Sequence, residues 1–250
     1  MWAYFWAYQT DLPADAGFDP FSRPHLTWVI AALTAIMILT CVHHKLMPAA
    51  RRRMEGLLAV VLALTYMLRW IWALVIGHYQ LNEMLPLQLC AVAAALDIAA
   101  VFSGKPVFRE FGYSCGLPGA VVVFLTPGIG PYPVLHFYYL LFIVDHSLLI
   151  LFPLIWIIND RFRPSFRRLP ACFGIVLVMA GLDVGVNRLI GSNYMFLNFV
   201  PDHTFWKPIA DRFGYPGYQL AMAGLLLLVW LILYAPWIAA ARRKTAKTLQ

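Results

Sequence analysis

Charged residues are scarce in this chain. Only 12% of its 250 residues are charged, about half the usual share of a soluble protein, whereas 62% are hydrophobic. So few polar side chains cannot cover the surface of a water-soluble globule. The lipid bilayer must therefore be the solvent for most of the chain, and we expect an integral membrane protein with no separate soluble domain.

Other absences exclude further classes of protein. The four cysteines lie in or beside apolar segments and none sits in an exposed loop with a partner, so we expect no disulfide framework. The basic residues are spread over short loops instead of forming one patch, so nucleic acid is not an expected partner. The last apolar segment contains no lysine that could form a Schiff base, which excludes a retinal protein.

The N-terminus lacks the basic residues that begin a signal peptide. Its aromatic residues Trp2, Phe5 and Trp6 are followed by acidic and proline-containing sequence. We predict that residues 1–25 form an outer interfacial segment in which these aromatic side chains lie at the membrane surface.

Apolar segments of membrane-spanning length recur along the chain. A span needs roughly 20 mostly apolar residues. We predict an all-α, polytopic membrane helix bundle that forms a single transmembrane domain over residues 1–250. The seven predicted spans are Leu26–Val42, Gly56–His78, Pro86–Phe102, Phe111–Leu125, Phe137–Ile158, Pro170–Ile190 and Tyr218–Ala240. The fourth is short and contains Gly112 and Gly116 at a spacing that lets helices approach closely.

Basic residues gather in alternate connections between the predicted spans. Arginine and lysine follow the first, third, fifth and seventh segments, for example at Arg51–Arg53, Lys105 and Arg161. The positive-inside rule places these connections in the cytoplasm. We therefore expect an outside N-terminus and a basic cytoplasmic tail at residues 241–250, in a bacterial-type inner membrane. Membrane lipids are the expected surroundings, and no protein partner is predicted.

Polar residues within the predicted spans are the candidates for function. A charge inside a bilayer is costly and usually faces the interior of a helix bundle. Cys90 and Asp97 are seven residues apart and so share one face of the third span. Asp183 and Asn187 share a face of the sixth, at a spacing of four.

Arg69 lies near the middle of the second predicted span. We expect it to pair with Asp97 or Asp183, because an unpaired charge at that depth is unfavourable. Several helices place polar groups in the outer half of the membrane, as expected for a site between helices. Arg69, Asp97, Asp183 and Asn187 are therefore expected to form a substrate-binding or structural polar network.

Cys90 differs from the other cysteines because it sits just inside the start of a predicted helix. The partial positive charge of a helix N-terminus favours a thiolate. A histidine in reach could act as its general base. The fifth span offers His146 and, ten residues earlier, His136. Cys41, Cys115 and Cys172 are interpreted as small hydrophobic residues.

Four stretches carry a family resemblance. They are LPLQLC (Leu85–Cys90), GLPGAVVVFLTP (Gly116–Pro127), HFYYLLFIVDH (His136–His146) and GSNYMFL (Gly191–Leu197). In these stretches the chain resembles the YwaF-like bacterial integral membrane family, whose eukaryotic relatives include transmembrane protein 164. The resemblance implies a cysteine-dependent acyltransferase acting on phospholipids. It places the family's cysteine on Cys90 and its helix-embedded histidine on His146, whereas Gln88 departs from the histidine often found there.

Two function classes stay open on the sequence. The first is a lipid acyltransferase or thioesterase-like enzyme in which Cys90 attacks an acyl ester, with no metal or cofactor expected. The second is a transporter or ligand-binding protein that uses Arg69, Asp97 and Asp183. A metal-dependent hydrolase based on His136, His146 and Asp183 is disfavoured, because closely spaced histidines are missing.

Overall fold

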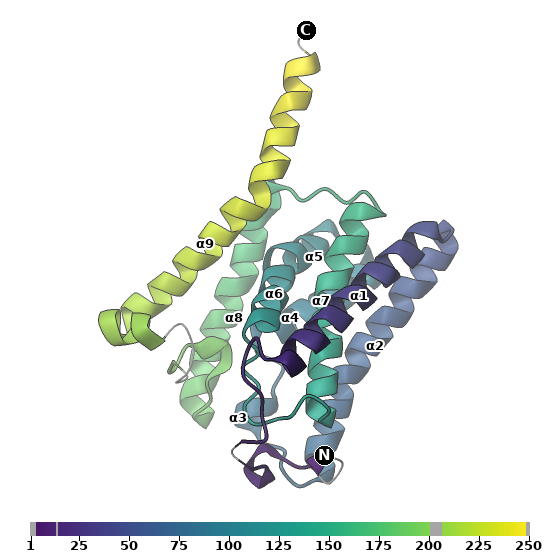
Figure 1. Cartoon of the computed structure of the whole chain (residues 1–250). Coiled ribbons are helices and arrows are strands. Elements are labelled where there is room, and N and C mark those ends of the chain that lie inside the picture. The colour runs from purple at the N-terminus through teal and green to yellow at the C-terminus, as the bar shows by residue number, and fades with distance from the viewer. Residues whose placement is uncertain (1–3, 14, 201–206, 249–250) are drawn as a thin grey trace. The chain divides into compact units, whose positions relative to one another are not determined.

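The computed structural model describes residues 4–13, 15–200 and 207–248, and all regular secondary structure in these ranges is helical (Figure 1). Trp2 lies outside the described residues. The chain divides into two compact units, Met1–Phe162 and Arg163–Gln250, each considered by itself below. The expectation of one transmembrane domain therefore stays a prediction.

The first unit contains most of the helices. Its elements are η2 (Gln9–Asp11), α1 (Arg23–Lys45), α2 (Pro48–Val75), α3 (Leu81–Met84), α4 (Leu89–Ser103), α5 (Pro106–Phe111), η3 (Gly112–Gly116), α6 (Leu117–Leu125) and α7 (Phe137–Ile158). The second unit contains η4 (Phe166–Arg168), α8 (Leu169–Ile190), η5 (Tyr194–Phe196) and α9 (Lys207–Thr248).

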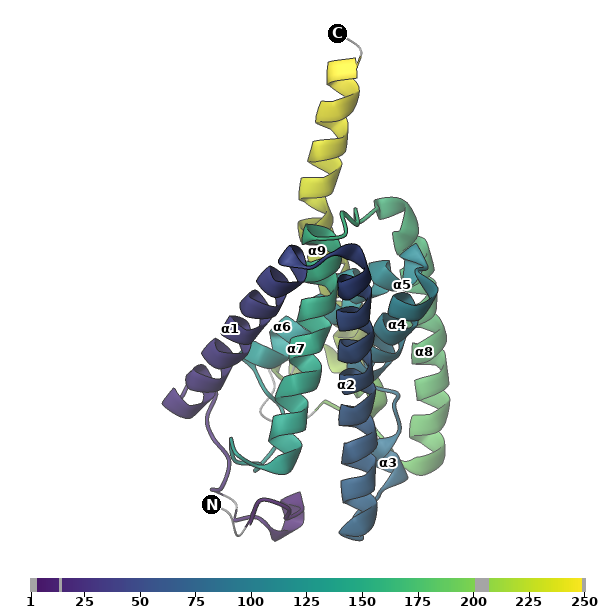
Figure 2. The same ribbon diagram turned by 90° about the vertical axis from the view of Figure 1, so that its right-hand side faces the viewer.

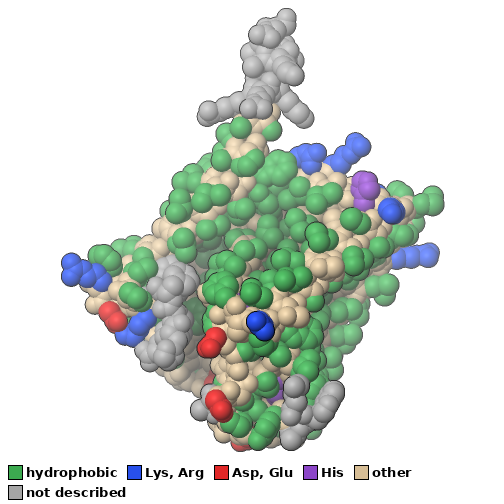
Figure 3. Space-filling view, in the orientation of Figure 1, with side chains coloured by type: hydrophobic (Ala, Val, Ile, Leu, Met, Phe, Trp, Pro, Cys, Tyr) green, Lys and Arg blue, Asp and Glu red, His purple; other side chains and the backbone are tan. Residues whose placement is uncertain are grey.

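The membrane character of the chain is confirmed. Among the described residues, five helical stretches are long and apolar enough to cross a bilayer: α1, α2, α7, Phe166–Ile190 and Gly217–Ala240. The two other predicted spans are also helical, but α4 has only 15 residues and the run α5–η3–α6 is broken by a π-helical turn. The number of seven spans and their orientation stay predictions. On the face seen in Figure 3, hydrophobic side chains cover most of the surface.

Proline and glycine set several of the helix boundaries. Pro48 and Pro106 stand in the first turn of α2 and α5, where a helix has no use for the missing N–H. Gly104 and Gly191 follow α4 and α8 with φ of 67° and 65°, the left-handed conformation that glycine adopts without strain. Gly104 therefore ends α4 well short of a full membrane span.

Helix α7 is the centre of the first unit. In the 18-residue apolar stretch of α7, 61% of the residues are buried, compared with 17% in α1 and 28% in α2. Helices α1, α2, α4 and α6 all pack against it, and Figure 2 shows α7 between α1 and α2. Its bounds coincide with the predicted span Phe137–Ile158.

A row of glycines lets η3 and α6 lie close against α4. Gly112 faces Asp97, Gly116 faces Ala93 and Gly119 faces Cys90. A Cβ added at Gly112 would collide with the Asp97 carboxylate, whereas one at Gly119 would lie 3.7 Å from the Cys90 sulfur. The predicted close approach at Gly112 and Gly116 is confirmed, and Cys90 and Asp97 share the face of α4 that meets these glycines.

The N-terminal segment covers one end of α2 and α7. Phe5 and Trp6 pack against the ring of Phe137, so these aromatic residues contact the bundle itself. Four hydrogen bonds hold the segment: Tyr8 Oη to Glu83 Oε2 (2.6 Å), Trp72 Nε1 to the Trp6 carbonyl (3.0 Å), His136 Nε2 to the Ala7 carbonyl (2.9 Å) and Phe137 N to the Phe5 carbonyl (3.1 Å).

Candidate functional site

Cys90 and His146 meet between α4 and α7. Cys90 is the second residue of α4, after the N-cap Gln88, so the predicted position in the first helical turn is confirmed. Its thiol is free and half-buried. His146 lies in the middle of α7, is 6% exposed, and its side chain hydrogen bonds to that of Cys90. A thiol and an imidazole in direct contact are the basic elements of a nucleophile and its general base.

Asp145 completes this arrangement. The Nδ1 of His146 lies 2.8 Å from the carbonyl oxygen of Phe142 and 2.5 Å from Oδ1 of Asp145. Because a carbonyl oxygen can only accept, Nδ1 must carry a hydrogen. The neutral imidazole therefore presents Nε2 as its acceptor. The carboxylate stabilises the positive charge that would form if His146 took a second proton.

Arg69 lies beside this group on α2. Its guanidinium lies over the ring of Tyr66, 4.7 Å from the centroid, and hydrogen bonds to the side chain of Tyr138. Asp145 belongs to its electrostatic surroundings, and Tyr66 in turn is within electrostatic range of Cys90. The Nε of Arg69 is buried without a hydrogen-bond partner among the described residues. A cation with an unused donor thus lies in the surroundings of Asp145, the neighbour of His146.

A family comparison covers all of these residues. Residues 20–234 match the model of the TMEM164 family. The chain belongs to the TMEM164 family. The matched range contains Cys90, His146, Asp145 and Arg69, so the site lies in the part of the chain that defines membership. No curated protein and no solved structure matches the chain.

Arg69 of this TMEM164-family protein was predicted to pair with Asp97 or Asp183, and the pairing with Asp97 is wrong. The carboxylate in the electrostatic surroundings of Arg69 is Asp145, on α7. Asp97 instead faces Gly112, is fully buried, and neither of its carboxylate oxygens has a hydrogen-bond partner among the described residues. Seven-residue spacing placed Asp97 on the correct face of α4, but it could not show which helix that face meets.

Asp183 and Asn187 belong to the second unit of the TMEM164-family chain. The side-chain oxygen of Asn187 accepts hydrogen bonds from Ser192 Oγ (2.7 Å) and Tyr194 N (2.8 Å), and its amide donates to the Tyr194 carbonyl (3.0 Å). Asn187 therefore holds the turn after α8. The Asp183 carboxylate is buried and has no hydrogen-bond partner within the described residues.

His136 occupies a structural position at the start of α7. Its Nδ1 accepts from Tyr138 N (3.0 Å), which caps the helix, and its Nε2 donates to the Ala7 carbonyl. Both ring nitrogens are thus occupied by backbone groups. Ten residues of helix separate His136 from His146, about 15 Å along the axis. The structure brings His146 to Cys90 and keeps His136 at the helix end.

The docking of the N-terminal segment should weaken in mild acid. Burial lowers the pKa of His136 below its ordinary value of 6.5, against an opposing contribution from the Ala7 carbonyl. The unfolded chain then binds more protons than the folded one, so the stabilisation present at higher pH is lost as pH falls through and below 6.5. After correction for the intrinsic effect of pH on exchange, the Phe137 amide should be less protected at pH 5.5 than at pH 7.5.

The matched control is His136→Asn, which can still accept from Tyr138 N but does not titrate. Its Phe137 amide exchange, corrected for the intrinsic effect of pH, should be the same at both values. An equal pH dependence in the variant would assign the effect to another group.

Proposed function

We propose that this protein transfers acyl groups to or from phospholipids through a covalent intermediate on Cys90. The observation that carries the proposal is the contact of the Cys90 thiol with His146, whose Nδ1 donates to the Phe142 carbonyl and lies in ion-pair distance of the Asp145 carboxylate. Membership of the TMEM164 family supports it, because the family resemblance implies a cysteine and a histidine at these positions.

The chemistry follows from the roles of these side chains. His146 takes the proton of the thiol, and the sulfur attacks the carbonyl carbon of an acyl ester. The ester C–O bond breaks, His146 returns the proton to the departing alcohol, and the acyl group remains on Cys90 as a thioester. A hydroxyl group of a lyso-lipid, or water, then attacks the thioester with His146 again as base. The product ester or acid leaves and the thiol is restored.

The position of Cys90 suits an attacking group. Cys90 stands in the first turn of a 15-residue helix, where backbone N–H groups without a partner inside the helix can stabilise negative charge that develops during the reaction. Gly119 faces the Cys90 sulfur and has no side chain that would cover it.

Arg69 is suited to hold the phosphate of the lipid. A guanidinium recognises phosphate through charge and directed hydrogen bonds, and its Nε here lacks a partner among the described residues. We propose, from the pattern of basic loops, that the chain has seven spans in a bacterial-type inner membrane, and that the site lies in the outer half of this membrane. The lipid would enter from the outer leaflet with its phosphate toward Arg69 and one ester toward Cys90.

The direct test is to find the thioester. Purified protein incubated with phosphatidylcholine vesicles that contain no lyso-lipid should carry an acyl mass on the Cys90 peptide. Neutral hydroxylamine should remove it, because thioesters are cleaved under conditions that leave oxygen esters intact. Peptides containing Cys41 or Cys115 serve as internal controls and should remain unmodified. Turnover without an acyl group on Cys90 would contradict the proposal.

Arg69→Gln should raise KM for phospholipid about tenfold, because a hydrogen bond between charged groups is lost. The same variant should use diacylglycerol, which has the ester but no phosphate, as well as the wild type does. Arg23→Gln, an exposed arginine at the start of α1, is the control for general loss of charge. An equal loss with both substrates would show that Arg69 has only a structural role.

A transporter or ligand-binding protein is the alternative function. It is favoured by the buried carboxylates of Asp97 and Asp183, whose oxygens have no hydrogen-bond partner among the described residues. Such groups mark ion and proton pathways in membrane proteins. This function would survive Cys90→Ala and fail when Asp183 is neutralised, whereas the acyltransferase would behave in the opposite way.

A further inference from the structure

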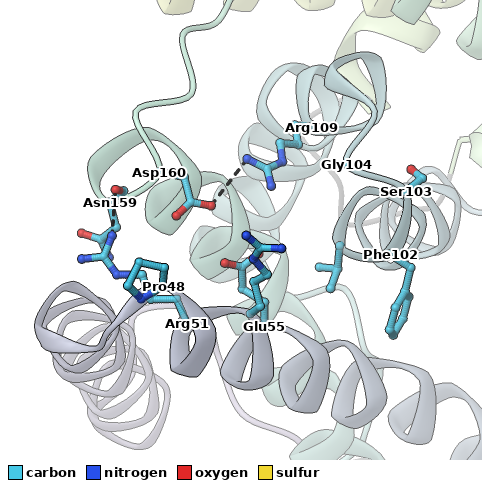
Figure 4. A pocket seen from close by; sticks show the side chains of 11 residues that line it. Pro48, Arg51, Glu55, Phe102, Ser103, Gly104, Arg109, Asn159 and Asp160 are labelled. Atoms are coloured by element: carbon cyan, nitrogen blue, oxygen red, sulfur yellow. Dashed lines mark hydrogen bonds and ion pairs between the residues drawn. The ribbon is translucent and has the colours of Figure 1, made fainter.

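A polar cavity lies at the C-terminal end of α4, far from Cys90. Figure 4 shows it between the start of α2, the end of α4, α5 and the residues after α7, and its volume is about 640 Å³. Ser103 in its wall follows Cys90 by 13 residues of helix, about 20 Å along the axis. The cavity is therefore separate from the thiol site, and all its lining residues belong to the first unit.

Three arginines line this cavity, but one of them is already occupied. Arg51 donates to the carbonyls of His44 (2.6 Å), Leu46 (3.0 Å) and Asn159 (3.1 Å). It thereby ties the α1–α2 connection to the end of α7. Arg51 shapes the wall and has little capacity left for a ligand.

The negative charge of the acidic residues in the wall does not fully neutralise the positive charge of the arginines. Glu55 is turned toward the protein interior, where it receives hydrogen bonds from His43 Nε2 (3.1 Å) and Trp156 Nε1 (3.4 Å). Asp160 forms an ion pair with Arg109, with 3.5 Å between Oδ2 and a terminal nitrogen. Two acidic residues thus line the cavity together with three arginines, which leaves one positive charge in excess.

A metal ion is a poor occupant even though His43, Glu55 and Asp160 place one ligand atom each within 4.8 Å of one another. The Asn159 amide nitrogen donates to the Thr40 carbonyl (3.1 Å), which fixes its orientation. That nitrogen also lies 2.9 Å from His43 Nδ1, which must therefore accept. The hydrogen of the neutral ring is then on Nε2, the atom that would have to bind the metal.

The two remaining arginines have unused donors. Arg52 is exposed and makes no hydrogen bond or ion pair with a described residue. Arg109 lies over the ring of Trp156, 5.2 Å from the centroid, and its Nε is buried without a partner in the described part of the chain. Two guanidinium groups that line one cavity provide the charge and the directed donors with which proteins bind phosphate.

We propose that this cavity binds the phosphate group of an anionic ligand, held by Arg52 and Arg109. Phe102, 69% exposed, forms the apolar side of the opening and would lie against the hydrocarbon part of a lipid or organic phosphate. The phosphate can come from a lipid headgroup or from a soluble molecule. The site is independent of acyl transfer, because it uses none of the residues around Cys90.

The test measures ligand-dependent melting of the full-length protein. One arm uses phosphatidylcholine nanodiscs with and without phosphatidic acid, and the other titrates inorganic phosphate in phosphatidylcholine nanodiscs. We expect stabilisation in at least one arm and an apparent affinity about tenfold lower in Arg52→Gln. Arg53→Gln is the matched control, because Arg53 is an exposed neighbour on α2 that does not line the cavity.

The outcomes separate the possible explanations. Stabilisation by phosphatidic acid would identify the ligand as a lipid headgroup, whereas stabilisation by inorganic phosphate would identify it as a soluble molecule. An equal loss in Arg52→Gln and Arg53→Gln would overturn the proposal in favour of diffuse surface charge, as would no stabilisation in either arm. Cys90→Ala should bind like the wild type, so a failure of the proposed acyl transfer would leave this result unaffected.

Discussion

Replacing Cys90 with alanine should abolish acyl-lipid turnover, with a loss of at least about 10³-fold in kcat. No other group near His146 can form a thioester, and His146 alone cannot supply the missing bond. The fold should be retained, because alanine suits a helix and the thiol lies in a half-buried position beside Gly119. The measurement is release of fatty acid or transfer to lyso-lipid by purified protein in vesicles.

Two other cysteines give matched controls for this variant. Cys41 is exposed on α1 and tests loss of an accessible thiol, whereas Cys115 is 2% exposed and tests loss of a buried one. Both alanine variants should keep activity near that of the wild type. Full activity in Cys90→Ala, with the protein correctly inserted, would rule out thiol catalysis and favour the transporter.

Asp145→Asn should reduce kcat by about 10²- to 10⁴-fold while leaving KM nearly unchanged. The amide is the same size, so the position of α7 is preserved. It carries no charge to stabilise the imidazolium, while the Phe142 carbonyl still keeps the hydrogen of the neutral ring on Nδ1. The expected loss is therefore confined to the chemical step.

A double variant distinguishes this role from simple destabilisation. Asp145→Asn combined with His146→Ala should be no slower than His146→Ala alone, because the two residues act as one unit. Asp97→Asn is the control for a neutralised buried carboxylate, since Asp97 does not contact His146 in the described structure. Additive losses in the double variant would mean that Asp145 acts elsewhere.

Hydropathy predicted the helices well because each span carries its signal within its own residues. All seven apolar segments are helical, and α7 has the predicted bounds. The length of α4 was less predictable, since Gly104 ends it after 15 residues. The packing of the N-terminal segment against the bundle could not be predicted, because its hydrogen-bond partners, such as Glu83, lie far along the chain. Its interfacial location stays a prediction.

The site was only partly predictable, because some of its contacts join residues that are far apart in the sequence. The position of Cys90 at a helix start and the choice of His146 depend on local sequence and resemblance. Asp145 was not among the predicted site residues, although it directly precedes His146 in the sequence. Adjacent residues can still meet through a side chain as long as that of histidine. The partners of Arg69 depend on how α2 packs against α7. The spacing of residues within one helix does not predict that packing.

The π-helical turn η3 has a consequence for insertions and deletions. Pro118 cannot donate a backbone hydrogen bond, and the Leu117 amide bonds back to Gly112, so the turn holds one residue more than a regular helix. Deleting one residue between 112 and 116 would therefore restore a regular helix, so Gly119 should still face Cys90 and the Phe124 carbonyl should stay near His25 Nε2, now 3.0 Å away. Deleting one residue between 120 and 123, in the regular part of α6, would instead rotate the Phe124 carbonyl by about 100° and break its contact with His25. The chain should thus tolerate a change of length in η3 that it does not tolerate in α6.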